Sequence, residues 1–371
     1  MEKLEKDSLS VRKKIAFYAV IFSTLAIVFF AATKYTMEYL EKPKELKLFR
    51  ENPHGTGSFR LKPNLHANTN VNNTKIQIRT NSHGMHWRDV DMNNAQKRVR
   101  IAFVGDSFTF GCWAESFQSS FVGVFEKNLP NTTYEVLNFG VGGYGLSDIE
   151  LLLKEEVSHF HPDYVILAFF NGNDFRDTYL GINKYNIVQG TARWNSNVIR
   201  EKLPREYRPD STAYEARNSK VTAESTSVFT DELKINRKFT SYTFWSQTPY
   251  PSVADSARTV SLKILDKIDT FVRSRDMTLL IVAIPYREQV YVKKVTGEDY
   301  NVELPQRHVE DYAAENGVPY LDLLPFLREY VHDNPEEIFI SGDPHLNTHG
   351  HRVVGDIIGN WFKSVLRTEK H

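Results

Sequence analysis

The sequence predicts an α/β protein: a three-layer α/β/α arrangement around a five-stranded parallel, flavodoxin-like sheet, preceded by an N-terminal transmembrane helix. The first observation is a series of five short runs that are apolar almost throughout, which is typical of strands covered on both faces. The second is that helical patterns separate these runs, and alternating strands and helices build parallel sheets. The third is a long uncharged apolar stretch close to the N-terminus.

The apolar stretch at residues 15–32 predicts a membrane-spanning helix. At about 1.5 Å per residue it would be roughly 27 Å long, close to a hydrocarbon core of about 30 Å. Basic residues before it place residues 1–14 in the cytoplasm and the rest of the chain across the membrane: Lys3, Lys6, Arg12, Lys13 and Lys14. A cleaved signal peptide is the alternative. Its apolar core is usually shorter, about 7–15 residues, and Phe29 and Phe30 spoil the small-residue cleavage pattern.

The remainder of the chain is predicted to be a linker and one large domain. Residues 33–57 are polar and interrupted by prolines, which is typical of a juxtamembrane linker. The domain then covers residues 58–371 and begins with an extension at 58–98. Within this extension, apolar and polar residues alternate over 74–80, which predicts a half-buried strand.

From residue 99 the chain alternates between strands and helices. The strands are expected at 99–104, 134–139, 163–170, 277–284 and 318–322, and the helices at about 116–128, 146–160, 253–274, 305–315 and 347–367. Five strands in this order suit the arrangement 2-1-3-4-5, in which ligands bind at the carboxyl ends of the strands.

Residues 175–250 interrupt this alternation. They are rich in Tyr, Asn, Arg and Ser, and their periodicity is weak. Because they lie between the third and fourth strands, we expect an insertion at the carboxyl edge of the sheet, where a lid or a substrate wall would sit. A structural excursion that covers the sheet edge is the alternative.

Composition limits the classes of function. The chain has 371 residues, of which 41% are hydrophobic and 25% charged, as in globular proteins. Lys and Arg together number 46, as do Asp and Glu, so the basic excess of a general nucleic-acid binder is missing. The only cysteine, Cys112, excludes an intrachain disulfide framework and a Cys-rich metal site.

Chemically competent residues follow the predicted strands. The first strand runs into Gly105-Asp106-Ser107, and a serine hydroxyl becomes a nucleophile when a base lies within about 2.6–3.2 Å. Asp343 and His345 are two residues apart, so in an extended loop their side chains project to the same side. The carboxylate could then orient the imidazole while its other nitrogen faces Ser107.

The same strand ends offer donors for a developing oxyanion. The candidates are the Ser107 amide, a glycine amide in residues 138–145 after the second strand, and the Asn173 side chain after the third. Each of these motifs occurs alone in ordinary turns. Their joint position at the strand and loop ends of one predicted sheet favours a catalytic interpretation.

Over residues 99–367 the chain resembles the SGNH hydrolase superfamily, the GDSL-type esterases and lipases. The resemblance implies the SGNH hydrolase fold, with Ser107 as the nucleophile and Asn173 in the Gly-x-Asn-Asp block as an oxyanion donor, although Asn171 replaces that block's glycine. It also implies that Gly143, five residues after an asparagine, is the oxyanion glycine.

The last block departs from the usual spacing of this superfamily. The usual form is Asp-x-x-His, whereas this chain has Asp343-Pro344-His345. The shorter form is similar to that of membrane-linked glycan acetylation proteins in the same superfamily. The resemblance therefore implies His345 as the base and Asp343 as its orienting carboxylate.

We expect neither a metal nor another cofactor. His345, His349 and His351 lack the acidic residue that a metalloprotease-type helix places between its histidines, so the last two are expected to cap or pack the final helix. His83 and His86 are assigned to a turn, and a place in the lining of the site is the alternative. Cys112 is expected to be a small core residue.

The sequence thus predicts a membrane-anchored, exported serine esterase with its catalytic domain in the periplasm or at the cell surface. The expected substrate is an acyl ester, either on an acetylated glycan or another short acyl ester. A hydrophobic groove that binds a lipid tail is the alternative. A polysaccharide O-acyltransferase that uses the same triad, with a membrane-bound acyl donor protein as partner, is the first alternative. A non-catalytic glycan-binding scaffold is the second. Acyl transfer to added polysaccharide, or its absence, separates the two enzymes.

Overall fold

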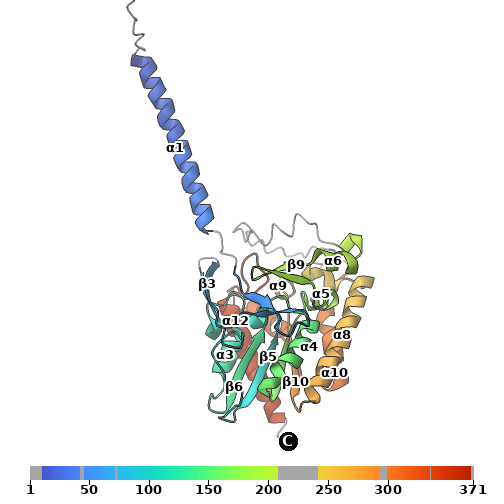
Figure 1. Ribbon diagram of the computed structural model, residues 1–371. Coiled ribbons are helices and arrows are strands. Elements are labelled where there is room, and N and C mark those ends of the chain that lie inside the picture. The colour runs from blue at the N-terminus through green and yellow to red at the C-terminus, as the bar shows by residue number, and fades with distance from the viewer. Residues whose placement is uncertain are drawn as a thin grey trace, which may run out of the picture. The chain divides into compact units, whose positions relative to one another are not determined.

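The computed structural model describes residues 11–41, 46–71, 74–207, 241–291, 299–334 and 336–368. The chain forms two compact units, Met1–Glu45 and Leu46–His371. The described part of the first unit is the single helix α1 (Val11–Glu41), and the second unit contains the sheets and the remaining helices (Figure 1).

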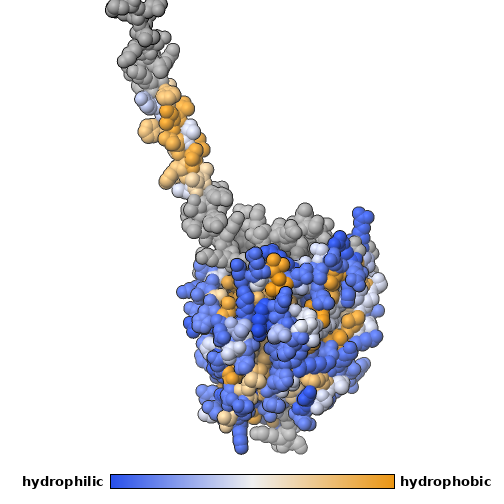
Figure 2. Space-filling model, viewed as in Figure 1, coloured by the Kyte–Doolittle hydropathy of each residue, from blue (hydrophilic) through white to orange (hydrophobic). Residues whose placement is uncertain are grey.

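Helix α1 contains a segment, Ala16–Thr33, that is long and apolar enough to cross a membrane, although a signal sequence near an N-terminus has the same character. Figure 2 shows the apolar side chains gathered along this segment, and Phe22 and Phe30 are among the most exposed large apolar residues in the described part of the chain. A helix that is apolar on all sides is stable when protein or lipid surrounds it. The predicted span, residues 15–32, therefore coincides with a suitable helix. Lys3 and Lys6, used in the orientation argument, lie outside the described residues.

The main sheet of the second unit confirms the predicted fold class. Its strands are β5 (Val99–Gly105), β6 (Tyr134–Gly140), β7 (Tyr164–Phe170), β10 (Thr278–Ile284) and β11 (Tyr320–Asp322). They pair in parallel in the order β6-β5-β7-β10-β11, which is the expected 2-1-3-4-5 arrangement. At the carboxyl end Gly105 pairs with Gly140 on one side and Ala168 on the other, so β5 and β6 end together and β7 continues to Phe170.

Alternate residues of each strand enter opposite halves of the core, because successive strand side chains point to opposite faces. Ala102 and Val104 of β5 pack toward the face covered by α4 (Leu146–Glu155), α8 (Ser252–Arg273) and α10 (Leu304–Asn316). Ile101 and Phe103 pack toward the face covered by α3 (Phe121–Lys127), α11 (Leu324–Asp333) and α12 (Thr348–Thr368). Burial on both faces explains why these strands read as continuous apolar runs (Figure 1).

Helices α3, α4, α8, α10 and α12 match the five predicted helices, and α4 ends in a 3₁₀ turn, Val157–Phe160. The structure adds helices that the sequence did not indicate: α2 (Ser107–Phe110), α5 (Asp174–Leu180), α6 (Ser196–Lys202), α9 (Arg287–Tyr291) and α11. Four of these have seven residues or fewer, too few for a helical period to be recognised. In α11 the proline in the first turn was a start signal that the prediction did not use.

Besides the main sheet, the described residues form three antiparallel strand pairs. The first is β1 (Phe49–Glu51) with β2 (Phe59–Leu61), and the second is β3 (His66–Val71) with β4 (Thr74–Arg79), the strand predicted at 74–80. The third is the hairpin of β8 (Tyr185–Val188) and β9 (Thr191–Trp194), within the predicted insertion. Residues 208–240 of that insertion lie outside the described residues.

Candidate active site

Ser107 occupies the first position of α2, directly after β5. The turn is tight: a Cβ on Gly105 would lie 2.2 Å from Thr109 Oγ1 and 2.8 Å from Ala168 O, so only glycine fits at the strand exit. Asp106 caps the short helix by accepting a hydrogen bond from the Phe108 amide at 2.9 Å. The Gly-Asp-Ser sequence therefore turns the chain sharply and presents the serine at the carboxyl edge of the sheet.

The structure brings Ser107 together with His345 and Asp343. His345 Nε2 lies 2.8 Å from Ser107 Oγ, and His345 Nδ1 lies 2.5 Å from Asp343 Oδ1. The three side chains form a continuous hydrogen-bonded relay in which the carboxylate holds the imidazole and the imidazole accepts from the hydroxyl. This is the spatial arrangement that the sequence-based interpretation required.

The Asp343-Pro344-His345 segment forms a compact turn rather than the extended loop that we expected. The Asp343 amide donates to Ile340 O at 3.1 Å, and the Ile340 amide donates to His345 O at 2.9 Å. Asp343 Oδ1 also accepts the His345 amide at 2.9 Å, which is an Asx turn. One carboxylate oxygen thus fixes both the backbone and the ring of His345, and this explains how the shorter Asp-x-His spacing aligns the pair.

The two charged groups of the relay shift each other's pKa. Burial lowers the pKa of His345, but the charge and hydrogen bond of Asp343 and the charge of Asp106 together outweigh it, so the pKa ends above its ordinary value near 6.5. Burial conversely raises the pKa of Asp343, and the attraction of His345 outweighs it and lowers that pKa overall. Burial raises the pKa of Asp106, beside Ser107, to about 6.

The predicted oxyanion residues follow the neighbouring strands. A Cβ on Gly142 would lie 3.7 Å from Ser107 Cβ, so the loop after β6 runs beside the serine. Gly143 has a φ of 83° and lies in a turn closed by the Tyr144 amide and Val141 O at 3.2 Å. Asn173 follows β7, and its side chain contacts the Asp106 carboxyl, next to Ser107.

Aromatic side chains that the sequence analysis did not select border this group. The Phe108 and Trp113 rings lie 5.0 Å and 6.3 Å from the His345 ring. Trp113 has a φ of 66°, which is strained for a tryptophan, and helps to lower the pKa of Asp343. Tyr185 covers the loop of Gly142 and Gly143, because its Cε2 atom would lie 3.0 Å from a Cβ on Gly143. Phe108 lies in α2 and Trp113 shortly after it, whereas Tyr185 comes from β8 of the insertion, and no sequence pattern marks the three rings.

The remaining histidines pack elsewhere. His86 is buried, stacks on Phe110 and lies 2.7 Å from its carbonyl oxygen, and burial lowers its pKa to about 4. His351 is buried against Phe121 at the start of α12, and His349 bonds to the Tyr330 hydroxyl. Cys112 is half-buried. Across the described ranges no group of three or more His, Cys, Asp or Glu side chains is placed to hold a metal ion.

The parallel sheet between two layers of helices brings Ser107, after β5, next to His345 and Asp343, in the loop before α12, which is the arrangement of a serine hydrolase. The family model of the GDSL-like lipase/acylhydrolase family matches residues 103–353, which is more than half of the chain. The chain therefore belongs to this family, as the resemblance implied.

Solved structures of similar fold include several esterases. A catalytic mutant of Axe2, an acetylxylan esterase from Geobacillus stearothermophilus, is 13% identical with a TM-score of 0.42, covering 71% of this chain and 93% of that one. A two-domain esterase active on acetylated mannans is 14% identical with a TM-score of 0.41, covering 74% of this chain and 52% of that one. A search of curated proteins found no match.

Proposed function

We propose that this protein is a membrane-anchored, exported serine esterase that hydrolyses an acetyl or other short acyl ester on a glycan. The observation that carries the proposal is the relay of Ser107 Oγ, His345 Nε2 and Asp343 Oδ1, with separations of 2.8 Å and 2.5 Å. The apolar α1 helix supports the anchor, and the basic residues before it support an extracytoplasmic domain.

In the proposed reaction, Ser107 Oγ attacks the ester carbonyl carbon while its proton passes to His345 Nε2. Collapse of the tetrahedral intermediate breaks the bond to the alcohol, which leaves with the proton from His345. Water then attacks the acyl-enzyme and gives a proton to His345. Collapse of this second tetrahedral intermediate breaks the bond to Ser107 Oγ, which takes the proton back from His345 as the carboxylic acid leaves. Asp343 keeps the imidazole in the tautomer that each step needs.

The oxyanion formed in both steps would be held by the Ser107 amide, the Gly143 amide and the Asn173 side chain. We expect Asn173→Ala to lower kcat by about 10²- to 10³-fold with little change in KM, because one donor contributes about 2.7–4 kcal/mol to the transition state. Steady-state kinetics on a nitrophenyl acetate ester measure this. Asn128→Ala, which changes a half-buried asparagine that donates to Asp356 at the end of α3, is the control and should retain full activity. If kcat of Asn173→Ala differs from that of wild type by less than twofold, Asn173 does not stabilise the oxyanion.

The raised pKa of His345 predicts a pH profile. The base must be neutral to accept the serine proton, so kcat/KM should rise with pH through a value above 6.5 and level off at higher pH. Asp343→Asn removes the charge that raises this pKa, so its acidic limb should move to lower pH and its plateau should fall by up to about 10⁴-fold. An unchanged limb in Asp343→Asn would show that another group controls the profile.

The glycan substrate is proposed from the family's action on acyl esters and from the rings beside the relay. Tyr185 and Phe49 border the Gly142–Gly143 loop, and aromatic rings offer flat apolar surfaces for a sugar ring. The test incubates the detergent-solubilised full chain with acetylated polysaccharides and measures free acetate. Acetate release supports the esterase. If acetyl groups are instead transferred to an added unacetylated polysaccharide and no acetate is released, the protein is an O-acyltransferase and not an esterase.

A further inference from the structure

The extension before the matched family region makes buried contacts with the loop that carries Gly143. Arg60, on β2, is buried, and its Nη1 donates to Tyr144 Oη at 2.8 Å. The Tyr144 hydroxyl in turn donates to Phe59 O. Tyr144 is fully buried and directly follows Gly143, so β2 holds one end of the turn that positions this glycine.

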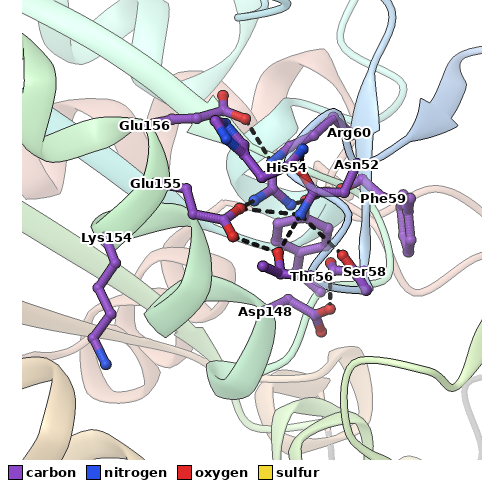
Figure 3. Close-up of polar contacts among 12 residues, drawn as sticks. Asn52, His54, Thr56, Ser58, Phe59, Arg60, Asp148, Lys154, Glu155 and Glu156 are labelled. Atoms are coloured by element: carbon purple, nitrogen blue, oxygen red, sulfur yellow. Dashed lines mark hydrogen bonds and ion pairs between the residues drawn. The ribbon is translucent and has the colours of Figure 1, made fainter.

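The other side of Arg60 is fixed at the end of α4. Its Nε lies 2.6 Å from Glu156 Oε1 and its Nη2 lies 2.5 Å from Glu155 Oε2 (Figure 3). Asn52 donates to the same Glu155 carboxylate at 3.0 Å. Because its guanidinium has partners on several sides, Arg60 is held rigidly, and its contact with Tyr144 is correspondingly well defined.

A second set of contacts fixes the residue after Tyr144. Asp148 Oδ2 accepts the Gly145 amide at 3.1 Å, and Asp148 Oδ1 accepts Ser58 Oγ at 2.6 Å (Figure 3). Asp148 also pairs with Lys184, which belongs to the insertion, and both side chains of this pair are fully buried. The oxyanion loop is therefore held by the extension on one side and by the insertion on the other.

The loop needs this support because it contains two adjacent glycines. Gly143 is the third residue of a turn and has a φ of 83°, the value of a type II turn, and glycines let the peptide between them flip at small cost. A flip of the Gly142–Gly143 peptide would turn the Gly143 amide hydrogen away. We propose that Arg60 and Tyr144 are positioning residues that hold the Gly143 amide toward the oxyanion. This inference rests on the proposed function, in which that amide is a donor.

The test uses Tyr144→Phe, which removes only the hydroxyl, and Arg60→Lys, which keeps the charge but not the fork of donors. Both should lower kcat on an acetyl ester by about tenfold or more while KM stays within about twofold, because the misplaced amide acts only in the transition state. Both should still react with a fluorophosphonate at Ser107, so a loss of the nucleophile is distinguishable from a loss of positioning.

Arg100→Lys is the matched control. Arg100 is fully buried and pairs with Glu135 at 2.8 Å, but this pair lies at the amino ends of β5 and β6, far along the strands from Ser107. It should lower the melting temperature as much as Arg60→Lys does and leave kcat within about twofold. Wild-type kcat in both Tyr144→Phe and Arg60→Lys, or an equal loss of kcat in Arg100→Lys, would overturn the positioning role. If Tyr144→Phe does not fold, the kcat of Arg60→Lys alone decides whether the positioning role holds.

Discussion

Ser107→Ala is expected to lower kcat for ester hydrolysis by about 10⁴- to 10⁶-fold, because no other group can form the acyl-enzyme. The substitution removes a hydroxyl that contacts only His345, at 2.8 Å, and Asp106, at 3.4 Å, among the described residues. We therefore expect the melting temperature to change little. Initial rates of the full chain in detergent, measured with a nitrophenyl acetate ester, give the ratio of the wild-type kcat to that of Ser107→Ala.

Ser119→Ala is the control for Ser107→Ala. Ser119 is half-buried in the same region of the chain, and its hydroxyl lies 3.4 Å from that of Ser116, a weak contact. It should retain wild-type kcat and KM. Residual activity of Ser107→Ala above about one part in a hundred, in a preparation free of wild-type protein, would show that the serine is not the nucleophile.

His345→Ala should lower kcat to nearly the same extent as Ser107→Ala, because the serine and its base act as one unit. Without the imidazole, the Asp106 carboxyl at 3.4 Å is the one acceptor that the described part of the chain offers to the proton of Ser107. The measurement is kcat on the same ester, for each single variant and for the double variant. The double variant should be no slower than the slower single one.

His349→Ala is the matched control, because His349 lies in the same segment but bonds to Tyr330. It should keep kcat within about twofold of wild type. Additive losses in the Ser107 and His345 variants would mean that the two residues act in separate steps, and an active His345→Ala would assign the base elsewhere.

Sequence reasoning predicted the main sheet because its strands are buried on both faces. Val99–Gly105 and Thr278–Ile284 are nearly continuous apolar runs, and their β-branched and aromatic residues can be read without any knowledge of their partners. Helix α12 was found for a similar reason, since an apolar face recurs along its length and packs against α3. In both cases the local pattern agrees with the tertiary packing.

The hairpin of β8 and β9 was missed because its signal is weak. Its strands are four residues long, and none of their eight residues is fully buried. Its two-residue loop is Gln189-Gly190 with φ values of 52° and 88°, a conformation that Asn-Gly or Asp-Gly usually signals. Glutamine at the first position is not a residue that predicts this type of turn.

The relay residues were predictable, but the groups that hold them were not. Gly-Asp-Ser and Asp-Pro-His are short motifs with a chemical meaning that can be stated from their residue types. Arg60 and Trp113 carry no such motif, because their roles depend on contacts with residues far along the chain, Tyr144 in one case and Asp343 in the other. Long-range packing of this kind does not leave a periodic trace in the sequence.

Mass-spectrometric mapping of a fluorophosphonate adduct tests the proposed nucleophile most directly. The full chain is treated with the probe at a pH above the His345 pKa, digested and mapped peptide by peptide. We expect one adduct, on the Ser107 hydroxyl, with labelling lost in Ser107→Ala and strongly slowed in His345→Ala. An unlabelled wild-type protein, or an adduct on another serine that persists in Ser107→Ala, would contradict the serine esterase assignment of this site.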